Sequence, residues 1–301
     1  MRLKNFLLLL FLASLWGPSF LFIKIAVVEI PPITLAAWRI FVAAIVINIY
    51  LYARGGTFVK DIQFWKHVTI AGFFAHALPF VLINWGEQFI DSALASILNG
   101  LTPIFTIVMA NFVIQDDRMD LGKVIGAIFG FIGLVILVLP SLVSGFQANT
   151  MGIFAVGIAA ASYGVALVYA RLNLKGTKPV YAPASQLLVT SIYLLPFSLA
   201  VDGPVKVMDL SWAALGSVLV LAILGTALAF VIYYKLLDSS SASYLSLVTY
   251  LIPLYGVVLG VTLLDETLTM STILGAVLIL LGIGVVNSKL EHRVKSKWKI
   301  N

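Results

Sequence analysis

The chain contains no cysteine and little charge. Charged residues make up only 11% of its 301 residues, and 61% are hydrophobic. The lack of cysteine excludes disulfides, thiolate metal sites and a cysteine nucleophile. Soluble domains carry about 25% charged residues, so the scarcity of charge predicts a protein embedded in a lipid bilayer. No polar stretch is long enough to fold as a separate soluble domain.

The chain also lacks the motifs of membrane enzymes and pumps. It has no phosphate-binding loop, no HExxH zinc motif and no nucleophile elbow. Its three histidines, His67, His76 and His292, are too scattered to predict a metal cluster. No apolar stretch holds an obvious acidic residue near its centre, which disfavours strong proton or sodium coupling. We therefore expect no cofactor and no metal, and an intramembrane enzyme is the least favoured class.

Ten apolar stretches are long enough to cross a bilayer, which takes about 20 helical residues. They lie near residues 5–23, 33–53, 67–86, 93–114, 121–140, 150–170, 182–201, 212–234, 242–263 and 270–288. Their connections are short, so neighbouring helices must be mostly antiparallel. No small-residue cleavage site follows the first stretch, so we interpret it as a retained helix and not a signal peptide. The sequence predicts an all-α membrane protein with ten transmembrane helices.

Basic residues are distributed unevenly between the two sides of this predicted bundle. With the N-terminus in the cytoplasm, sixteen Lys and Arg fall on the cytoplasmic side. Only Lys24 and Lys206 fall outside, and Arg39 lies within the second stretch. This bias follows the positive-inside rule, so both termini are predicted to be cytoplasmic. The net charge of +6 is thereby explained by topology, and we expect the lipid bilayer, not a nucleic acid, as a partner.

Several short motifs occur twice, in the same order along the chain. The pairs are Trp16-Gly17 with Tyr163-Gly164, Lys24 with Arg171, Thr102-Pro103 with Ile252-Pro253, Asp116-Asp117 with Asp265-Glu266, and Gly126-Ala127 with Gly275-Ala276. The pattern divides the chain into residues 1–147 and 148–301. Each copy holds five stretches, an odd number, so the second is inverted relative to the first. Two inverted five-helix repeats around a central cavity are typical of secondary transporters.

Two prolines, Pro103 and Pro253, fall near the middle of the fourth and ninth stretches. A proline within a helix frees the backbone carbonyl four residues earlier. Helical spacing places polar residues on the same face as each proline, namely Ser96 and Asn99 in the fourth stretch and Ser246 and Thr249 in the ninth. We predict that these faces line a polar central path and that the prolines serve as hinges. The alternative is a structural kink whose freed carbonyls bond the Asn and Thr side chains.

Polar and aromatic residues within other stretches complete the predicted site. His76 is the best candidate for an ionisable group inside the membrane; the alternative is a neutral histidine bonded to a neighbouring helix. Aromatic rings can hold an apolar side chain or attract an ammonium. The predicted substrate contacts are Trp16, Ser19, Trp38, His76, Phe80, Asn84, Ser96, Asn99, Tyr163, Gln186, Ser246, Thr249 and Tyr250.

Three further features are given structural roles. Arg39 is near the end of its stretch, so we expect it to snorkel or to bond a neighbouring carbonyl and not to contact substrate. Glu87 is expected to be solvated near the outer interface. The GxxxG spacing of Gly126 and Gly130 permits close helix contact, which we expect to be internal, so the protein is predicted to be a monomer or a weak dimer.

Taken together, these motifs resemble a known family. Trp16-Gly17 with Phe20, Arg39, the 93–103 stretch and the acidic pairs before the Gly-Ala motifs are similar to the drug/metabolite transporter superfamily, of the ten-helix EamA type. Within it the chain resembles the bacterial YddG-type amino-acid exporters. The resemblance implies a basket of helices around a central cavity, with the fifth and tenth helices at one side.

The same resemblance implies a function. It points to export of aromatic or neutral amino acids and related metabolites across a bacterial inner membrane by alternating access. No basic residue lies in the middle of a stretch apart from Arg39, which is taken as peripheral. Since the phosphate-handling relatives place Lys or Arg in the cavity, a phosphorylated substrate is disfavoured. Two alternatives remain: a broad exporter of small organic cations, or a membrane sensor or scaffold that transports nothing.

Overall fold

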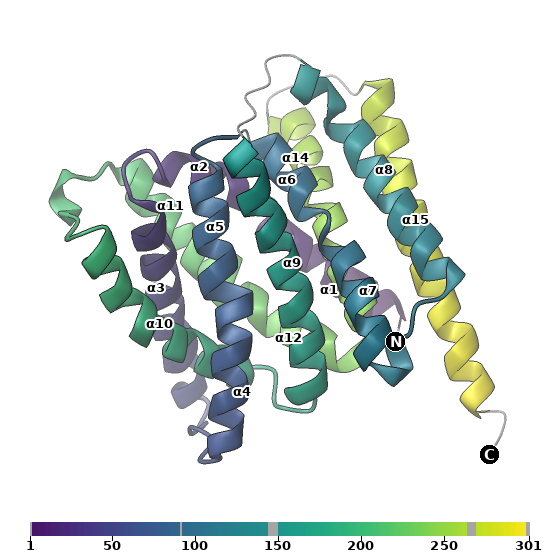
Figure 1. The fold of residues 1–301 in the computed structure, drawn as a ribbon, viewed down its shortest axis with the longest axis horizontal. Helices are drawn as coiled ribbons and strands as arrows, with labels where there is room; N and C mark the ends of the chain where they lie inside the picture. The colour runs from purple at the N-terminus through teal and green to yellow at the C-terminus, as the bar shows by residue number, and fades with distance from the viewer. Residues whose placement is uncertain (1, 91, 144–149, 264–268, 299–301) are drawn as a thin grey trace.

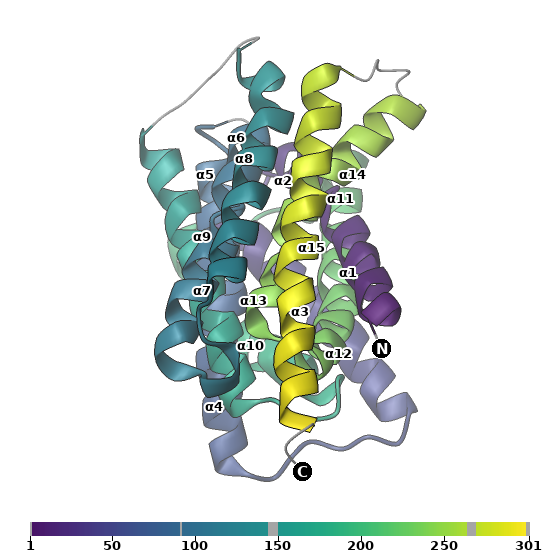
Figure 2. The same cartoon turned by 90° about the vertical axis from the view of Figure 1, so that its right-hand side faces the viewer.

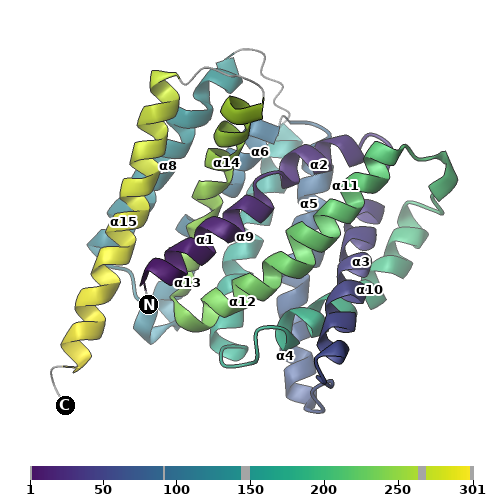
Figure 3. The same cartoon turned by 180° about the vertical axis from the view of Figure 1, so that it is seen from behind.

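The structure, a computed structural model, describes residues 2–90, 92–143, 150–263 and 269–298. Every regular element in these residues is helical. The predicted repeat motif Asp265-Glu266 lies outside the described residues. Figures 1–3 show the helices gathered in one bundle, with α1 crossing behind α9 in the first view.

The first half of the chain forms helices α1 (Arg2–Trp16), α2 (Ser19–Ala26), α3 (Pro32–Ala53), α4 (Ile62–Gly72), α5 (Leu78–Gly86), α6 (Ser92–Asn99), α7 (Thr102–Val113) and α8 (Leu121–Val143). The second half forms α9 (Thr150–Asn173), α10 (Tyr181–Val201), α11 (Trp212–Ala222), α12 (Ala229–Ser239), α13 (Ala242–Ser246), α14 (Val248–Leu263) and α15 (Met270–Trp298). Short π-helices join α4 to α5 (η1, Phe73–Ala77) and α11 to α12 (η4, Ile223–Leu228), and 3-10 turns η2 (Gln115–Asp117) and η3 (Val207–Asp209) occupy two connections.

Among the described residues, seven helical stretches are long and apolar enough to cross a membrane. They are Leu3–Ala26, Pro32–Ala53, Ile62–Gly86, Leu94–Val113, Thr150–Asn173, Tyr181–Val201 and Trp212–Ser239. Shorter apolar helices run over Leu121–Leu137, Ala242–Tyr255 and Met270–Val286. The all-α, membrane-spanning class predicted from the sequence is confirmed, while the count of ten crossings stays a prediction.

Some of the predicted continuous stretches are interrupted in the middle. The first breaks at Gly17-Pro18 between α1 and α2, and the fourth breaks at residues 100–101 between α6 and α7. In the ninth, Leu247 separates α13 from α14. Close packing favours glycine at the first two breaks, because a Cβ on Gly17 would lie 2.8 Å from the Cβ of Tyr255, and one on Gly100 would lie on Leu134. Interrupted membrane helices survive only against protein or a cavity.

The two prolines lie at different places in their helices. Pro253 is inside α14, as expected. Pro103 is in the first turn of α7, where a missing N–H is tolerated, so it differs from the expected mid-helix position. The hydroxyl of Thr102 donates to the carbonyl of Asn99 over 2.7 Å. A side chain thereby supplies the bond that the break removes.

Helices α8 and α15 lie side by side at one edge of the bundle (Figures 1 and 3). Glycines set their separation: a Cβ on Gly126 would lie 2.6 Å from the carbonyl oxygen of Gly282, and one on Gly133 would lie 2.7 Å from that of Gly275. The ring of Tyr250 packs in the same way on Gly130. These glycines serve contacts within one chain, and the oligomeric state stays a prediction.

Candidate functional site

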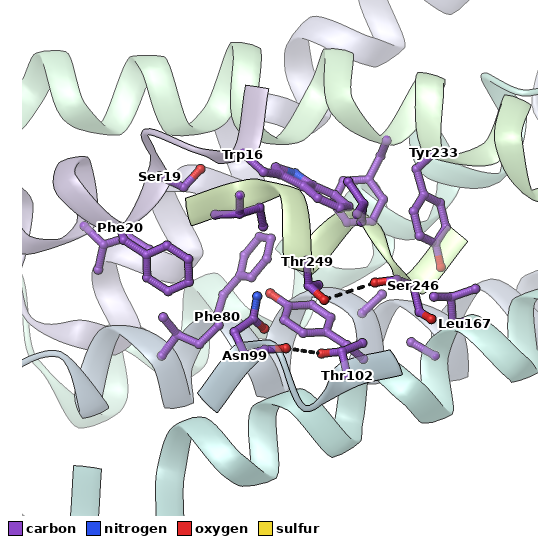
Figure 4. A pocket seen from close by; sticks show the side chains of 18 of the residues that line it. Trp16, Ser19, Phe20, Phe80, Asn99, Thr102, Leu167, Tyr233, Ser246 and Thr249 are labelled. Atoms are coloured by element: carbon purple, nitrogen blue, oxygen red, sulfur yellow. Dashed lines mark hydrogen bonds between the residues drawn. The ribbon is translucent and has the colours of Figure 1, made fainter. Parts of the chain in front are cut away.

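An interior cavity of about 80 Å³ lies where the interrupted helices meet. Its lining comes from residues 16–102 and from residues 163–252. Seven of the predicted substrate contacts are in this lining, namely Trp16, Ser19, Phe80, Asn99, Tyr163, Ser246 and Thr249. Figure 4 shows Ser19 and Phe20 on one side of the space and Thr102, Ser246 and Thr249 on the other. The structure thus brings these predicted residues together.

Four other predicted contacts lie away from the cavity lining. Trp38 packs against an apolar cluster around α2 and α3. The amide of Asn84 donates to the carbonyl of Pro32 over 3.0 Å, and the Tyr250 hydroxyl donates to the carbonyl of Ala127 over 2.9 Å. Ser96 is buried in α6 outside the lining. The contacts of Trp38 and Tyr250 are structural. The Oδ1 of Asn84 is buried without a hydrogen-bond partner in the structure, and substrate contact by Asn84 and Ser96 stays a prediction.

His76 and Gln186, also predicted contacts, form a buried polar chain behind the lining. The His76 Nε2 lies 3.2 Å from the Gln186 Oε1, and the Gln186 amide donates to the Tyr234 hydroxyl. The His76 ring packs on that of Phe230, a lining residue, with the two centroids 4.3 Å apart. The geometry is that of the alternative interpretation, a histidine bonded to a neighbouring helix.

Arg39 lines the cavity, although the sequence favoured a peripheral position. Its side chain is buried, with Nε donating to the Thr226 hydroxyl over 2.8 Å and Nη2 donating to the Gly225 carbonyl over 3.3 Å. The guanidinium carbon lies 3.9 Å from the centroid of the Phe80 ring. The expected bond to a carbonyl is present. The argument against a phosphorylated substrate no longer holds, because it required that no cation line the cavity.

No carboxylate in the described part of the chain lies within ion-pair distance of Arg39. Both of its hydrogen-bond acceptors are neutral. The Gly225 carbonyl also accepts a bond from the Trp16 indole over 2.9 Å. That carbonyl belongs to η4, and π-helical turns alter the regular backbone pairing and are frequent at functional sites. The cavity therefore carries a positive charge that no carboxylate among the described residues compensates.

Three hydroxyl groups of the lining bond to the backbone of their own chain segment. Thr102 donates to Asn99 as described, Ser246 donates to the Ser243 carbonyl over 2.8 Å, and Thr249 donates to the Ser246 carbonyl over 3.0 Å. A hydroxyl has one hydrogen and two lone pairs. With that hydrogen committed, each oxygen offers only acceptor capacity to a ligand.

The rest of the lining is largely apolar. None of these residues was predicted to contact substrate, although Phe20 and Ile252 belong to motifs in the sequence. They are Phe20, Ile23, Ala75, Ile83, Ala166, Leu167, Phe230, Tyr233, Val248 and Ile252. Their residue types are common in every membrane helix, so the sequence contained no signal to separate them. Such a surface suits an apolar side chain of a ligand.

Glu87 directly follows α5 and is fully buried, contrary to the expectation of a solvated carboxylate. Its Oε2 accepts a bond from Ser92 over 3.1 Å, and its Oε1 has no hydrogen-bond partner in the structure. Lys24 donates to the backbone carbonyls of Glu87 and Ile90 and not to the carboxylate. Burial raises the pKa of Glu87 to about 8, against the lowering effects of Ser92 and Lys24.

A bundle of apolar helices, interrupted around a buried cavity of mixed polarity, is the architecture of a membrane transporter. The sequence profile of the EamA-like transporter family matches residues 4–139 and again residues 150–288. The chain therefore belongs to this family within the drug/metabolite transporter superfamily. It is a multi-pass membrane transporter, a class of protein that does not catalyse a chemical reaction.

Relatives match over nearly the whole chain. The uncharacterized transporter YoaV of Bacillus subtilis is 27% identical over 89% of this chain and 91% of its own length. A probable amino-acid metabolite efflux pump of Escherichia coli is 27% identical over 94% of both chains. A crystal structure that is 20% identical superposes with a TM-score of 0.78, covering 97% of this chain and 99% of that chain, which shows the shared fold.

Proposed function

We propose that the protein is a secondary transporter that exports neutral or aromatic amino acids and related metabolites by alternating access. The observation that carries this proposal is the central cavity, where aromatic and apolar side chains surround Arg39 and a group of acceptor hydroxyls. An α-amino acid has the matching parts, two charged groups and a side chain. The name of the Escherichia coli relative, a probable amino-acid metabolite efflux pump, points the same way.

The proposed motion is a rocking of residues 1–147 against residues 148–301 around the cavity. The family profile matches once in each of these ranges. We place the end of the bundle that holds the 54–61, 114–120 and 174–180 connections (Figure 1) in the cytoplasm of a bacterial inner membrane. Basic residues Arg54, Lys60, Arg118, Lys175 and Lys178 are concentrated there, as the positive-inside rule requires.

Efflux from liposomes tests the proposal. Purified protein is reconstituted into liposomes loaded with a panel of labelled amino acids, and release is followed with time. The Val248→Trp substitution places an indole in the cavity, so the substrate can enter only by displacing it. Flux is expected to fall by about tenfold or more, which corresponds to a cost of about 1.4 kcal/mol or more. Val108→Trp makes the same change at an exposed position of α7 and should leave flux unchanged.

Two results would contradict the proposal. Absence of flux for every amino acid, from protein that is monodisperse and thermally stable, rejects amino-acid export. Equal flux from Val248→Trp and the wild type rejects this cavity as the path. An exporter of organic cations would show flux for cationic dyes in the same vesicles; the uncompensated charge of Arg39 opposes it, because like charges repel strongly in a low-dielectric interior.

A further inference from the structure

The cavity has a positive side formed by Arg39. A guanidinium carries five N–H donors, and its bonds to Thr226 and Gly225 leave donors over for a ligand. The guanidinium carbon also lies 3.9 Å from the centroid of the Phe80 ring, so a cation–π contact holds the group at the cavity. A buried cation with neutral partners only has lost its hydration without gaining a counter-charge, so a ligand carboxylate that forms a bidentate pair with it is strongly favoured.

The break in the first stretch adds to this positive side. Helix α2 begins at Ser19, and both Ser19 and Phe20 line the cavity. The first N–H groups of a helix lack partners within the helix and carry a partial positive charge. Ser19 lies beside Arg39, since both approach the same point at Gly225: a Cβ placed there would lie 3.2 Å from the Ser19 Oγ and 3.6 Å from the Arg39 Nη2.

The opposite side of the cavity offers acceptors. The hydroxyl oxygens of Thr102, Ser246 and Thr249 have given their hydrogens to backbone carbonyls. Figure 4 shows them together, across the space from Ser19. Helix α6 ends beside them at Asn99, whose Oδ1 is buried and has no hydrogen-bond partner in the structure. A helix C-terminus carries partial negative charge, so this side suits an ammonium.

We propose that the cavity binds the zwitterionic head group of an α-amino acid in one orientation. The carboxylate pairs with Arg39, and the ammonium is held at the hydroxyl oxygens of Ser246 and Thr249. The side chain of the ligand then lies against the apolar lining. This inference rests on the proposed function. It adds which residues bind the carboxylate and which bind the ammonium of the ligand.

Three ligands with the same phenyl ring distinguish the contribution of the carboxylate to binding from that of the ammonium. They are phenylalanine, phenylalaninamide, which lacks the carboxylate, and 3-phenylpropionate, which lacks the ammonium. Their binding to the purified wild type is measured by calorimetry in detergent. We expect phenylalanine to bind at least about tenfold more tightly than either analogue, because a hydrogen-bonded charge is worth about one to two powers of ten in affinity.

Single substitutions then test which residue binds the carboxylate and which binds the ammonium. Arg39→Gln should weaken phenylalanine and 3-phenylpropionate by about tenfold or more. It should not weaken phenylalaninamide and should strengthen its binding, because the cationic amide no longer meets a like charge. Thr249→Val should weaken the two ammonium ligands and spare 3-phenylpropionate. Matched controls are Arg54→Gln, an exposed arginine at the end of the same helix, and Thr69→Val, a hydroxyl bonded to its own helix outside the cavity lining. Neither should change any of the three affinities.

The outcomes separate this inference from the function on which it rests. If the wild type transports phenylalanine but binds phenylalaninamide equally well, the inference is overturned and amino-acid export stands. If 3-phenylpropionate binds through Arg39 and no amino acid is transported, the anion site stands and the proposed function fails. Failure to bind any of the three ligands overturns the inference. Should Arg39→Gln not fold, Arg39→Lys replaces it, and it must keep the preference for carboxylate ligands at reduced affinity.

Discussion

At the scale of single residues, burial determines the ionisation of Glu87. Burial disfavours the charged carboxylate and so raises the pKa of this residue. A carboxylate that is not held in an ion pair is costly to remove from water, and Lys24 bonds the backbone carbonyl of Glu87 and not its carboxylate. The neutral acid is favoured instead, which is why the pKa of Glu87 is raised from the ordinary 4.5 to about 8. At neutral pH the residue is therefore mainly an uncharged hydrogen-bonding group at the end of α5.

This shift predicts how stability depends on pH. Between pH 4.5 and about 8 the folded protein holds a proton at Glu87 that the unfolded chain has lost. Stability should therefore fall as pH rises through this window and level off above it. Glu87→Gln should remove that slope, leaving the variant more stable than the wild type above pH 8, as measured by thermal unfolding in detergent at a series of pH values.

Glu29 provides the control for this experiment. It lies exposed in the loop before α3, where two hydrogen bonds from Ser211 lower its pKa. The contribution of Glu29 to folding stability is lost only as the pH falls toward and below the ordinary carboxyl pKa of 4.5. This pH dependence is opposite in direction to that of Glu87. Glu29→Gln should leave the slope between pH 4.5 and 8 unchanged. A wild-type profile that is flat over this window would contradict the assignment to Glu87.

Neighbouring residues show what the sequence could and could not predict about the site. Thr249 and Tyr250 were both predicted contacts, yet Thr249 lines the cavity and Tyr250 points to α8. Successive residues of a helix differ by about 100° in direction, so a periodic pattern gives a face only when the orientation of the helix is known. In a membrane both faces are apolar. For the same reason Arg39 could be placed along its helix but not around it.

At the scale of elements, the α8–α15 contact depends on backbone atoms meeting without side chains. A Cβ on Gly282 would lie 2.5 Å from the Gly126 carbonyl oxygen and 2.7 Å from the Gly130 nitrogen, whereas one on Gly284 would meet nothing within 4 Å. Gly282→Ala should therefore lower the thermal stability in detergent by about 1–3 kcal/mol, the usual cost of overpacking.

Gly284→Ala is the matched control, two residues away in the same helix. It should be neutral or stabilising by up to about 1 kcal/mol, because alanine is the better helix former. Equal loss of stability in both variants would show that glycine is needed for a reason other than this contact.

The elements themselves were predictable to different degrees. Apolar stretches of the right length located the membrane helices, because the bilayer imposes that length on any sequence. The interruptions at Gly17-Pro18 and at residue 100 were not predicted, and neither were the π-helices η1 and η4. Hydropathy is unchanged across a break, and whether a helix breaks depends on which atoms of other helices are present to satisfy its freed groups.

At the scale of the whole molecule, two polar bridges join the proposed halves in equivalent ways. Arg39 bonds Thr226 in η4, and Gln186 bonds His76 in η1. Arg39 and Gln186 have the same separation in sequence as the proposed repeat pair Trp16 and Tyr163. One bridge lines the cavity and the other lies behind it. If the two halves are inverted repeats, we expect the two bridges to exchange roles in the state that opens to the other side of the membrane. The bridge of Gln186 would then line the cavity, and that of Arg39 would lie behind it.

Contacts at both ends of the bundle provide a test of this rocking motion. At one end Asn5 bonds Ser239 over 3.1 Å, and at the other the backbone and hydroxyl of Thr34 bond the Asp202 carboxylate over 2.8 Å. Each pair joins the two proposed halves. The chain has no cysteine, so introduced cysteines are the only thiols available to a cross-linker.

We expect that linking either pair stops transport. Asn5→Cys with Ser239→Cys, or Thr34→Cys with Asp202→Cys, is treated with a short bis-methanethiosulfonate reagent in liposomes. Alternating access requires each end to open in turn, so a link at either end should abolish flux, and a reductant should restore it. Asn111→Cys with Met119→Cys, a contacting pair within the first half, should be linked without loss of flux. Full transport by completely cross-linked protein at either end would show that these halves do not move against each other there.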